Sequence, residues 1–416
     1  MKGNYFVKIM AMTLMSAVLT VGCGKNASAV SMEQLDFQTE ISDITVPENI
    51  RIVGLGEASH GVKEYQQMKM KVFQALVKNN GCRTFIIEGD FGGALKVNDY
   101  IHGGEGTAEE MVSEIGFRIY NTQEMAELLK WMREYNTTAA DGEDLHFYGM
   151  DMQRYDNNKE YLFSVLDEAA PELGEKYKDA FASLTDEDRF SLSGSDFKQA
   201  KKDAQQLVSE MDAAQEDMVS LVGQEAFDLA RECANTIYMC SDVMTCSNMD
   251  YNKLRDSYMF EKIEWFMQHE DGVLFINGHN GHIGKKSIAG YTCLGEQIDK
   301  SIGEDYFAIG TDAMSTEFNS QGNNGEFSVM EVANQNELNQ QCNNIDEGFY
   351  YIDFSEVTDE QTQNIISGRQ RITTLNVGIA HWQKLLKMFY TTTVVPQESF
   401  DGMIVFKKVS PTTLWE

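Results

Sequence analysis

The chain has 416 residues, 42% of them hydrophobic, so it can bury one large core or two ordinary ones. It carries 65 acidic and 34 basic residues, and its formal net charge of −31 excludes a nucleic-acid surface because phosphates would be repelled. Only four prolines occur, as in domains rich in helix. No proline-rich or glycine/serine-rich linker and no internal repeat divides the chain.

The N-terminal residues resemble a bacterial lipoprotein signal peptide. Lys2 and Lys8 precede the apolar stretch 9–21, which is too short to span a bilayer comfortably and leads into Cys23. We therefore expect residues 1–23 to be the signal, Cys23 to be lipidated, and residues 24–44 to be a tether. The protein would then be extracytoplasmic and anchored at the membrane surface. The alternative is ordinary secretion after cleavage near residue 29.

Six further cysteines permit disulfides in an extracytoplasmic protein. A large core needs no covalent staples, and several of these cysteines lie in apolar helical contexts, where a free thiol packs as a small hydrophobe. We expect free thiols. The six are Cys82, Cys233, Cys240, Cys246, Cys293 and Cys342.

Strands and helices are expected to alternate from residue 51 onward. A helix over 62–80 follows from apolar residues at three- and four-residue spacing, and Gly81 supplies its end. Thr122 is expected to cap a helix over 123–135 within the helical region 91–135. The first two strands flank a helix, which predicts a parallel pair. The expected strands are 51–55, 84–87, 145–149, 273–276 and 306–310, followed by β-rich runs at 326–332, 348–354 and 402–409.

From about residue 160 to 269 the pattern is helical and charged, with no convincing strand. Residues 156–246 are therefore predicted to be a helical insertion, and 247–269 to be the helix that leads back to the sheet. The predicted class is α/β. A mainly parallel central sheet is flanked by helices, a large helical insertion forms a second lobe, and the folded domain covers residues 45–416.

Several of the expected strands deliver an acid or a histidine at the same end. In open α/β sheets that carboxyl edge is where ligands bind, so one shared site is predicted. The side chains are Glu57 and His60 after the first strand, Glu88 after the second, Asp151 after the third, and His279 and His282 after the fourth.

His60 is the predicted general base, because an unperturbed imidazole has a pKa near neutrality and can take a proton from water at little cost. Glu57 or Glu88 would fix its tautomer and stabilise the imidazolium. His279 and Arg255 are expected to stabilise a developing oxyanion. The chain has no Gly-x-Ser-x-Gly motif, so activated water is the expected nucleophile.

Other assignments stay open at this point. Ser59 could be a nucleophile beside His60, although a substrate contact is the expected role for Ser59, His282 and Asp151. A zinc site is the metal-dependent alternative. It would use Glu57, His60, His279 and His282. The leading hypothesis needs neither a metal nor a cofactor. The remaining histidines are expected to be ordinary surface or core residues: His102, His146, His269 and His381.

The order and spacing of these motifs resemble the erythromycin esterase family, a group of bacterial hydrolases that open macrolide lactones and give macrolide resistance. The likeness spans about residues 52–406. It is carried by the motifs at 55–61 (Leu-Gly-Glu-Ala-Ser-His-Gly), 87–90 (Ile-Glu-Gly-Asp), 121–124, 131–136, 149–151, 254–259, 278–283 (Gly-His-Asn-Gly-His-Ile) and 400–404.

The resemblance implies metal-independent hydrolysis of a small-molecule ester or a macrolide-like lactone by activated water. It makes His60 the general base with Glu57 as its neighbour. Glu88 and His279 would complete the site, and Arg255 would assist. The chain departs from the family pattern at residues 61–63 (Gly-Val-Lys). A non-enzymatic alternative is a surface-anchored ligand-binding protein that lost catalysis.

Overall fold

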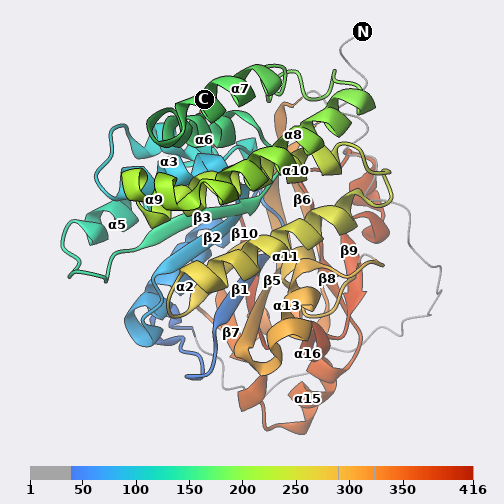
Figure 1. Cartoon of the computed structure of the whole chain (residues 1–416). Helices are drawn as coiled ribbons and strands as arrows, with labels where there is room; N and C mark the ends of the chain where they lie inside the picture. The colour runs from blue at the N-terminus through green and yellow to red at the C-terminus, as the bar shows by residue number, and fades with distance from the viewer. Residues whose placement is uncertain (1–38, 289, 323–324, 416) are drawn as a thin grey trace.

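The central sheet of the computed structural model is mostly parallel (Figure 1). The structure describes residues 39–288, 290–322 and 325–415, so Cys23 and the predicted signal peptide lie outside the described residues. The strand order is β3-β2-β4-β1-β5-β10-β7, with β6 beside β5. β6 and β7 are antiparallel to their neighbours, which gives the mixed edge that the sequence predicts. The strands are β1 (Ile52–Glu57), β2 (Thr84–Asp90), β3 (His146–Asp151), β4 (Leu274–His279), β5 (Tyr306–Gln321), β6 (Phe327–Ala333), β7 (Phe349–Asp353) and β10 (Gly402–Val409).

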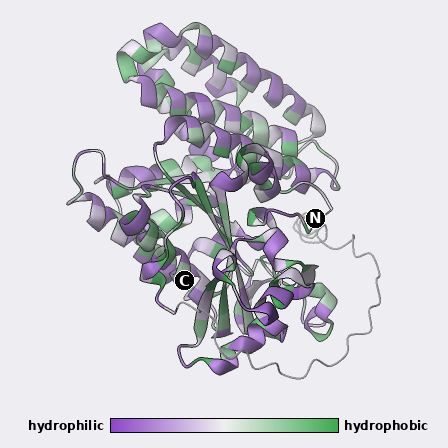
Figure 2. Ribbon diagram, turned by 90° about the horizontal axis from the view of Figure 1, so that it is seen from below, coloured by the Kyte–Doolittle hydropathy of each residue, from purple (hydrophilic) through white to green (hydrophobic). Residues whose placement is uncertain are grey.

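The sheet separates two apolar cores, because successive side chains of a strand point to opposite faces. Ile52 and Ile86 belong to one core, and Val53 and Phe85 belong to the other. In Figure 2 the strands are largely hydrophobic, as expected of a sheet buried on both faces. The first face carries α11 (Tyr251–His269) and α13 (Leu294–Ile302), and the second carries α2 (Lys63–Asn80), α4 (Ala108–Glu114) and α5 (Gln123–Asn136), with α3 (Phe91–Ile101) contributing to both.

The helical insertion gathers beside one end of this assembly as a second lobe (Figure 1). Its core is continuous with the first core of the sheet, where Leu166, Met211 and Ile237 join the cluster that contains Ile86. The predicted α/β class with a helical second lobe is thereby confirmed. The helices are α6 (Asp156–Ala169), α7 (Pro171–Ala180), α8 (Gly194–Ala213), α9 (Gln215–Val222) and α10 (Gln224–Val243).

One strand pairing differs from the prediction. β1 and β2 are parallel but are not neighbours, because β4 lies between them and pairs with both. The strand–helix–strand pattern involves residues close in sequence, whereas β4 follows the helical insertion in the chain and still pairs between these two strands. The consequence is functional, since the end of β4 now lies between the ends of the two strands that carry Glu57 and Glu88.

The local signals for helix ends are confirmed. Gly81 ends α2 in the left-handed region at φ 65°, and the Thr122 side chain accepts a hydrogen bond from the Met125 amide at the start of α5. The region 91–135 is divided into three helices, and α11 begins at Tyr251 rather than at residue 247. The β8–β9 hairpin is an addition that the sequence analysis missed. The remaining elements are β8 (Gln370–Thr373), β9 (Thr391–Val394), α12 (Asn280–Ile283), α14 (Glu337–Gln341), α15 (Glu360–Ser367) and α16 (Pro396–Ser399).

The folded part of the chain begins earlier than expected. Ile41 and Ile44 are buried in the second core, so the last residues of the tether predicted at 24–44 belong to the domain. The six cysteines from Cys82 to Cys342 are free thiols, as predicted. Among the described helices, none combines the length and the apolar character needed to cross a membrane.

Candidate active site

The carboxyl edge of the sheet brings together the predicted acids and histidines. Glu57 ends β1 directly opposite His279, which ends β4. Glu88 lies two residues before the carboxyl end of β2, and its Oε2 accepts a hydrogen bond of 2.9 Å from the His279 amide. A Cβ on Gly278 would lie 3.0 Å from the same carboxylate oxygen, so a glycine here lets Glu88 pack against the β4 backbone.

Glu57 and His60 form a buried pair. The His60 Nδ1 lies 3.4 Å from Glu57 Oε2, and Lys69 of α2 makes an ion pair with the other oxygen. Burial raises the pKa of Glu57, but Lys69 and then His60 outweigh it and hold the pKa below its ordinary value. Glu57 is therefore a carboxylate at neutral pH, and its contact with Nδ1 leaves the opposite ring nitrogen of His60, Nε2, available as a proton acceptor.

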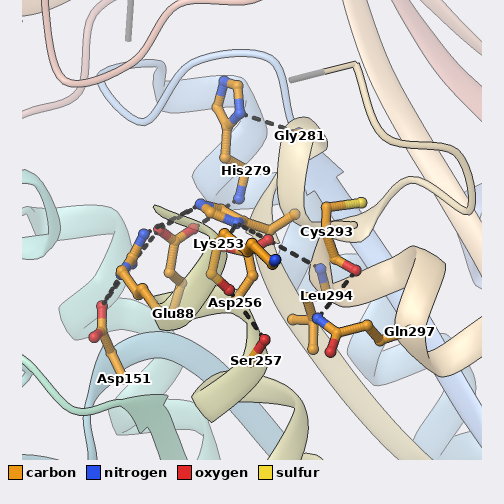
Figure 3. A network of polar contacts seen from close by, with 12 residues as sticks. Glu88, Asp151, Lys253, Asp256, Ser257, His279, Gly281, Cys293, Leu294 and Gln297 are labelled. Carbon is orange, nitrogen blue, oxygen red and sulfur yellow. Dashed lines mark hydrogen bonds and ion pairs between the residues drawn. The ribbon is translucent and has the colours of Figure 1, made fainter. Parts of the chain in front are cut away.

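His279 faces His60, with ring centroids 5.5 Å apart. The Gly281 amide donates to His279 Nδ1 at 3.1 Å, as Figure 3 shows, so this nitrogen carries the lone pair and the proton is on Nε2. Burial and then the nearby His60 lower the pKa of His279 to about 3, so the ring is neutral. Its Nε2 is buried and has no hydrogen-bond partner among the described residues. His279 is thus a neutral N–H donor in need of an acceptor.

A second group of charges lies beside this pair and is centred on Arg255 of α11. Its Nη2 contacts Glu88 Oε1 at 2.7 Å and Asp151 Oδ2 at 2.5 Å. Figure 3 shows Asp151 and Glu88 side by side below His279. Burial raises the pKa of Glu88, but His282 and Arg255 outweigh it and keep the pKa well below the ordinary range. The guanidinium therefore pairs with two buried carboxylates and holds Glu88 against the β4 backbone.

His282 belongs to this second group rather than to a metal site. Its Nδ1 lies 2.9 Å from Asp256 Oδ1, and its Nε2 lies 3.2 Å from Arg255 Nη1. Burial lowers the pKa of His282, but Asp256 and Glu88 outweigh it and raise the pKa. Both ring nitrogens are engaged. In the described part of the chain the ligand atoms of the four residues proposed for zinc do not converge. Those four are Glu57, His60, His279 and His282.

Each predicted site residue can now be placed. Glu57, His60 and His279 face one another, and Glu88, Arg255, Asp151 and His282 form the adjoining network. Ser59 is fully buried beside them, with no partner for its hydroxyl among the described residues. The hollow lined by residues of α6 and α7 contains none of these side chains.

Sequence reasoning missed Lys69 and Asp256, both fully buried. Lys69 lies on the apolar stripe of α2, four residues after Tyr65 and three before Val72, and a lysine on such a stripe was a detectable signal of a buried charge pair. Asp256 directly follows Arg255 in the helix, and its Oδ2 also accepts from the Leu294 amide at 2.9 Å.

The fold and site define a class: an α/β protein with a buried carboxylate and two facing imidazoles at the carboxyl edge of its sheet. The sequence model of the erythromycin esterase family matches residues 77–409. The chain therefore belongs to the erythromycin esterase family. Membership supports an esterase or a related hydrolase. Glu57 and His60 precede the matched segment, so their assignment depends on the geometry described above.

Individual proteins show the same likeness. The chain is 26% identical to erythromycin esterase type II of Escherichia coli over 295 residues, which cover 64% of this chain and 69% of that protein. A Bacillus cereus protein of known crystal structure superposes with a TM-score of 0.77 at 22% identity, over 88% of this chain and 91% of that one. A mutant of the erythromycin esterase EreC in its open conformation gives 0.60 at 16% identity, over 89% and 93%. These structural likenesses establish the fold.

Proposed function

We propose that this protein hydrolyses a carboxylic ester or lactone, a macrolide-like lactone included, with water activated by His60. The observation that carries the proposal is the opposition of the His60 ring and the neutral His279 ring, 5.5 Å apart by centroid, with the Glu57 carboxylate behind His60. A base on one side and a hydrogen-bond donor on the other are the two groups that acyl transfer to water requires.

In this mechanism His60 Nε2 takes a proton from water, and the water oxygen bonds to the carbonyl carbon. The carbonyl π electrons move to oxygen, and the His279 Nε2–H donates to that oxyanion. Collapse of the tetrahedral intermediate breaks the bond to the alkoxy oxygen, which receives the proton from His60. Glu57 stabilises the imidazolium that exists between the two transfers, and Lys69 keeps Glu57 ionised.

The Arg255 network has a positioning role in this proposal. Glu88 holds the His279 amide, and Arg255 with Asp151 holds Glu88. The sequence predicts that Arg255 stabilises the oxyanion directly, but its two carboxylate partners favour a role one step removed from the reacting atoms. Substrate contacts remain proposed for Ser59 and His282, whereas Asp151, for which the same role is predicted from the sequence, is fully buried and pairs with Arg255.

The proposal is tested by mass spectrometry of macrolides, simple lactones and carboxylic esters after incubation with wild type and His60→Ala. We expect products heavier by one water, or the corresponding acid and alcohol, with wild type alone. The matched control is His381→Ala, which removes an exposed imidazole and should leave turnover unchanged.

Equal turnover by His60→Ala would exclude His60 as the base. Loss of wild-type activity on treatment with a chelator, with recovery on adding zinc, would instead favour the metal-dependent alternative. Saturable binding with no change in the mass of any ligand would favour the ligand-binding alternative.

We also propose that Cys23 is lipidated and holds the protein at the membrane surface. The support is the basic and apolar stretch that ends at this cysteine in the sequence. The test is to express the full chain and its Cys23→Ala variant in a bacterial host. We expect the wild type in the membrane fraction and the variant in the soluble extracytoplasmic fraction. Equal membrane association of both forms would contradict lipidation.

A further inference from the structure

Two histidines that the sequence analysis assigned to ordinary surface or core positions converge at the amino-terminal end of the sheet, opposite the active site. His102 follows the last residue of α3, and His146 is the first residue of β3. The Nε2 atoms of both rings lie 3.1 Å from one oxygen, Oδ2 of Asp144. Their ligand atoms all lie within 4.8 Å of one another, and no other group of three or more His, Cys, Asp or Glu in the described residues meets that distance.

The second nitrogen of each ring is already held. His102 Nδ1 lies 2.7 Å from the Asn98 carbonyl oxygen, which can only accept, so Nδ1 carries a proton and the neutral ring has its lone pair on Nε2. His146 Nδ1 lies 2.9 Å from Glu270 Oε2, and Thr84 Oγ1 donates to the same oxygen at 2.8 Å. Metal-binding histidines almost always donate their outer N–H to a carboxylate or a backbone carbonyl in this way.

We propose that His102, Asp144 and His146 form a binding site for a divalent metal ion of the zinc type. Tetrahedral zinc with ligands at 2.0–2.1 Å separates its ligand atoms by about 3.3 Å. The two observed separations of 3.1 Å need only a small expansion to admit the ion. Two imidazoles and one carboxylate suit zinc better than calcium or magnesium, which prefer oxygen ligands.

The site has an open fourth position and an entry path. His102 is exposed, and Asp144 and His146 are half-buried, so solvent reaches the cluster. Water would complete the coordination. The bound ion would connect the end of α3 with the start of β3 and, through Glu270, with the turn between α11 and β4. Because the active site lies at the other edge of the sheet, this role is structural and independent of the proposed hydrolysis.

The test measures Zn²⁺ binding by isothermal titration calorimetry, with the whole protein freed of metal beforehand. We expect one site in wild type, at least about tenfold weaker binding in His102→Ala and Asp144→Asn, and about tenfold weaker binding in Glu270→Gln, whose carboxylate orients His146. Zn²⁺ should also raise the melting temperature of wild type and not that of His102→Ala. Because His102 is exposed, this variant keeps its fold even if Asp144→Asn does not.

Two controls separate this site from others. His269→Ala removes an exposed imidazole on α11 outside the cluster, and His60→Ala removes the active-site base; both should bind Zn²⁺ as wild type does. The proposal is overturned if wild type shows no saturable binding, or if His102→Ala binds as tightly as wild type. If His102→Ala weakens Zn²⁺ binding but leaves esterase activity unchanged, the metal site is independent of the proposed hydrolysis, and either proposal can fail without the other.

Discussion

Two neighbouring histidines have different polar partners, which favour different protonation states of the two rings. His279 receives an N–H from Gly281 and is buried, so it is neutral and presents a proton. His60 instead faces the Glu57 carboxylate, which stabilises a protonated ring. Two imidazoles at 5.5 Å would compete for one proton if their surroundings were alike, and the different partners remove that competition.

We predict that His279→Ala lowers kcat by about 10²- to 10³-fold with a smaller change in KM, because in the proposed mechanism the lost Nε2–H donates to the oxyanion of the transition state. The pKa of His279 is about 3, so its protonation does not change near neutrality and the loss should be the same from mildly acidic to mildly alkaline pH. The measurement is a pH–rate profile, with His381→Ala as the surface control. A loss confined to one limb of the profile would contradict this role.

Lys69→Met should shift the acid limb of activity to higher pH. Lys69 holds the pKa of Glu57 down against the effect of burial, so the variant carboxylate takes up a proton at a higher pH and stops supporting His60. The favourable contribution of an ionised Glu57 to stability is present above its unfolded pKa and is lost as pH falls through the folded pKa. An unpaired buried charge also costs about 3–5 kcal/mol of unfolding free energy.

The matched control is Lys71→Met, which removes an exposed lysine from the same helix. Denaturant unfolding measures the stability of both variants, and a pH–rate profile measures the position of their acid limbs. An acid limb that stays in place in Lys69→Met would show that this lysine does not set the charge of Glu57.

At the scale of elements, the sequence predicted most strands but not their neighbours. An apolar run that ends in Glu57, Glu88 or His279 marks both a buried strand and the edge at which its chemistry lies. Such a run does not show which strands are neighbours in the sheet. β4, which pairs with both β1 and β2, follows the whole insertion in the sequence. Lys69 was missed although it lies on the apolar stripe of α2, because most helical lysines are solvated and the sequence does not identify Glu57 as its partner.

The α11 helix supplies the next prediction. Arg255→Lys should destabilise the protein by about 1–3 kcal/mol and lower activity, because an ammonium keeps the charge but cannot reproduce the guanidinium contacts to Glu88 and Asp151 together. Lys253→Arg makes the reverse change at an exposed position of the same helix and should be neutral. Urea unfolding measures both.

The pH dependence of that effect has a defined sign. The pKa of Glu88 is held well below its ordinary range, so its contribution to stability is present above the unfolded pKa and disappears as pH falls. The difference between wild type and Arg255→Lys should therefore shrink in acid. A difference independent of pH would mean that the lost contribution is packing rather than charge.

At the scale of the whole molecule, one buried carboxyl joins the sheet to the insertion. Asp90 ends β2, accepts from the Gly93 amide at 2.7 Å as the cap of α3, and accepts from Asn158 of α6 at 3.0 Å. Sequence reasoning could identify Asp90 as a helix cap, because an aspartate before a helical run is a local signal. Its contact with the insertion is tertiary and has no such signal.

Asp90→Asn should make the protein less sensitive to alkaline conditions. Burial raises the pKa of Asp90 to about 7, so the folded state binds a proton that the unfolded state releases at lower pH. Stability from this group therefore falls as pH rises from the unfolded value to about 7, by a total on the order of a few kcal/mol. An asparagine amide does not titrate, so the variant does not lose this stability as pH rises. It can still accept from Gly93 and can donate to Asn158 Oδ1, which has no partner among the described residues.

The measurement is urea unfolding of wild type and Asp90→Asn at about pH 5 and about pH 8, on either side of most of this titration. The free energy of unfolding of the variant, relative to wild type, should rise between the two conditions. Asp179→Asn removes an exposed carboxylate from α7 and should show no such rise. If the relative stability of Asp90→Asn is the same at both pH values, then Asp90 is ionised in the folded protein, and the junction between sheet and insertion holds a charge rather than a proton.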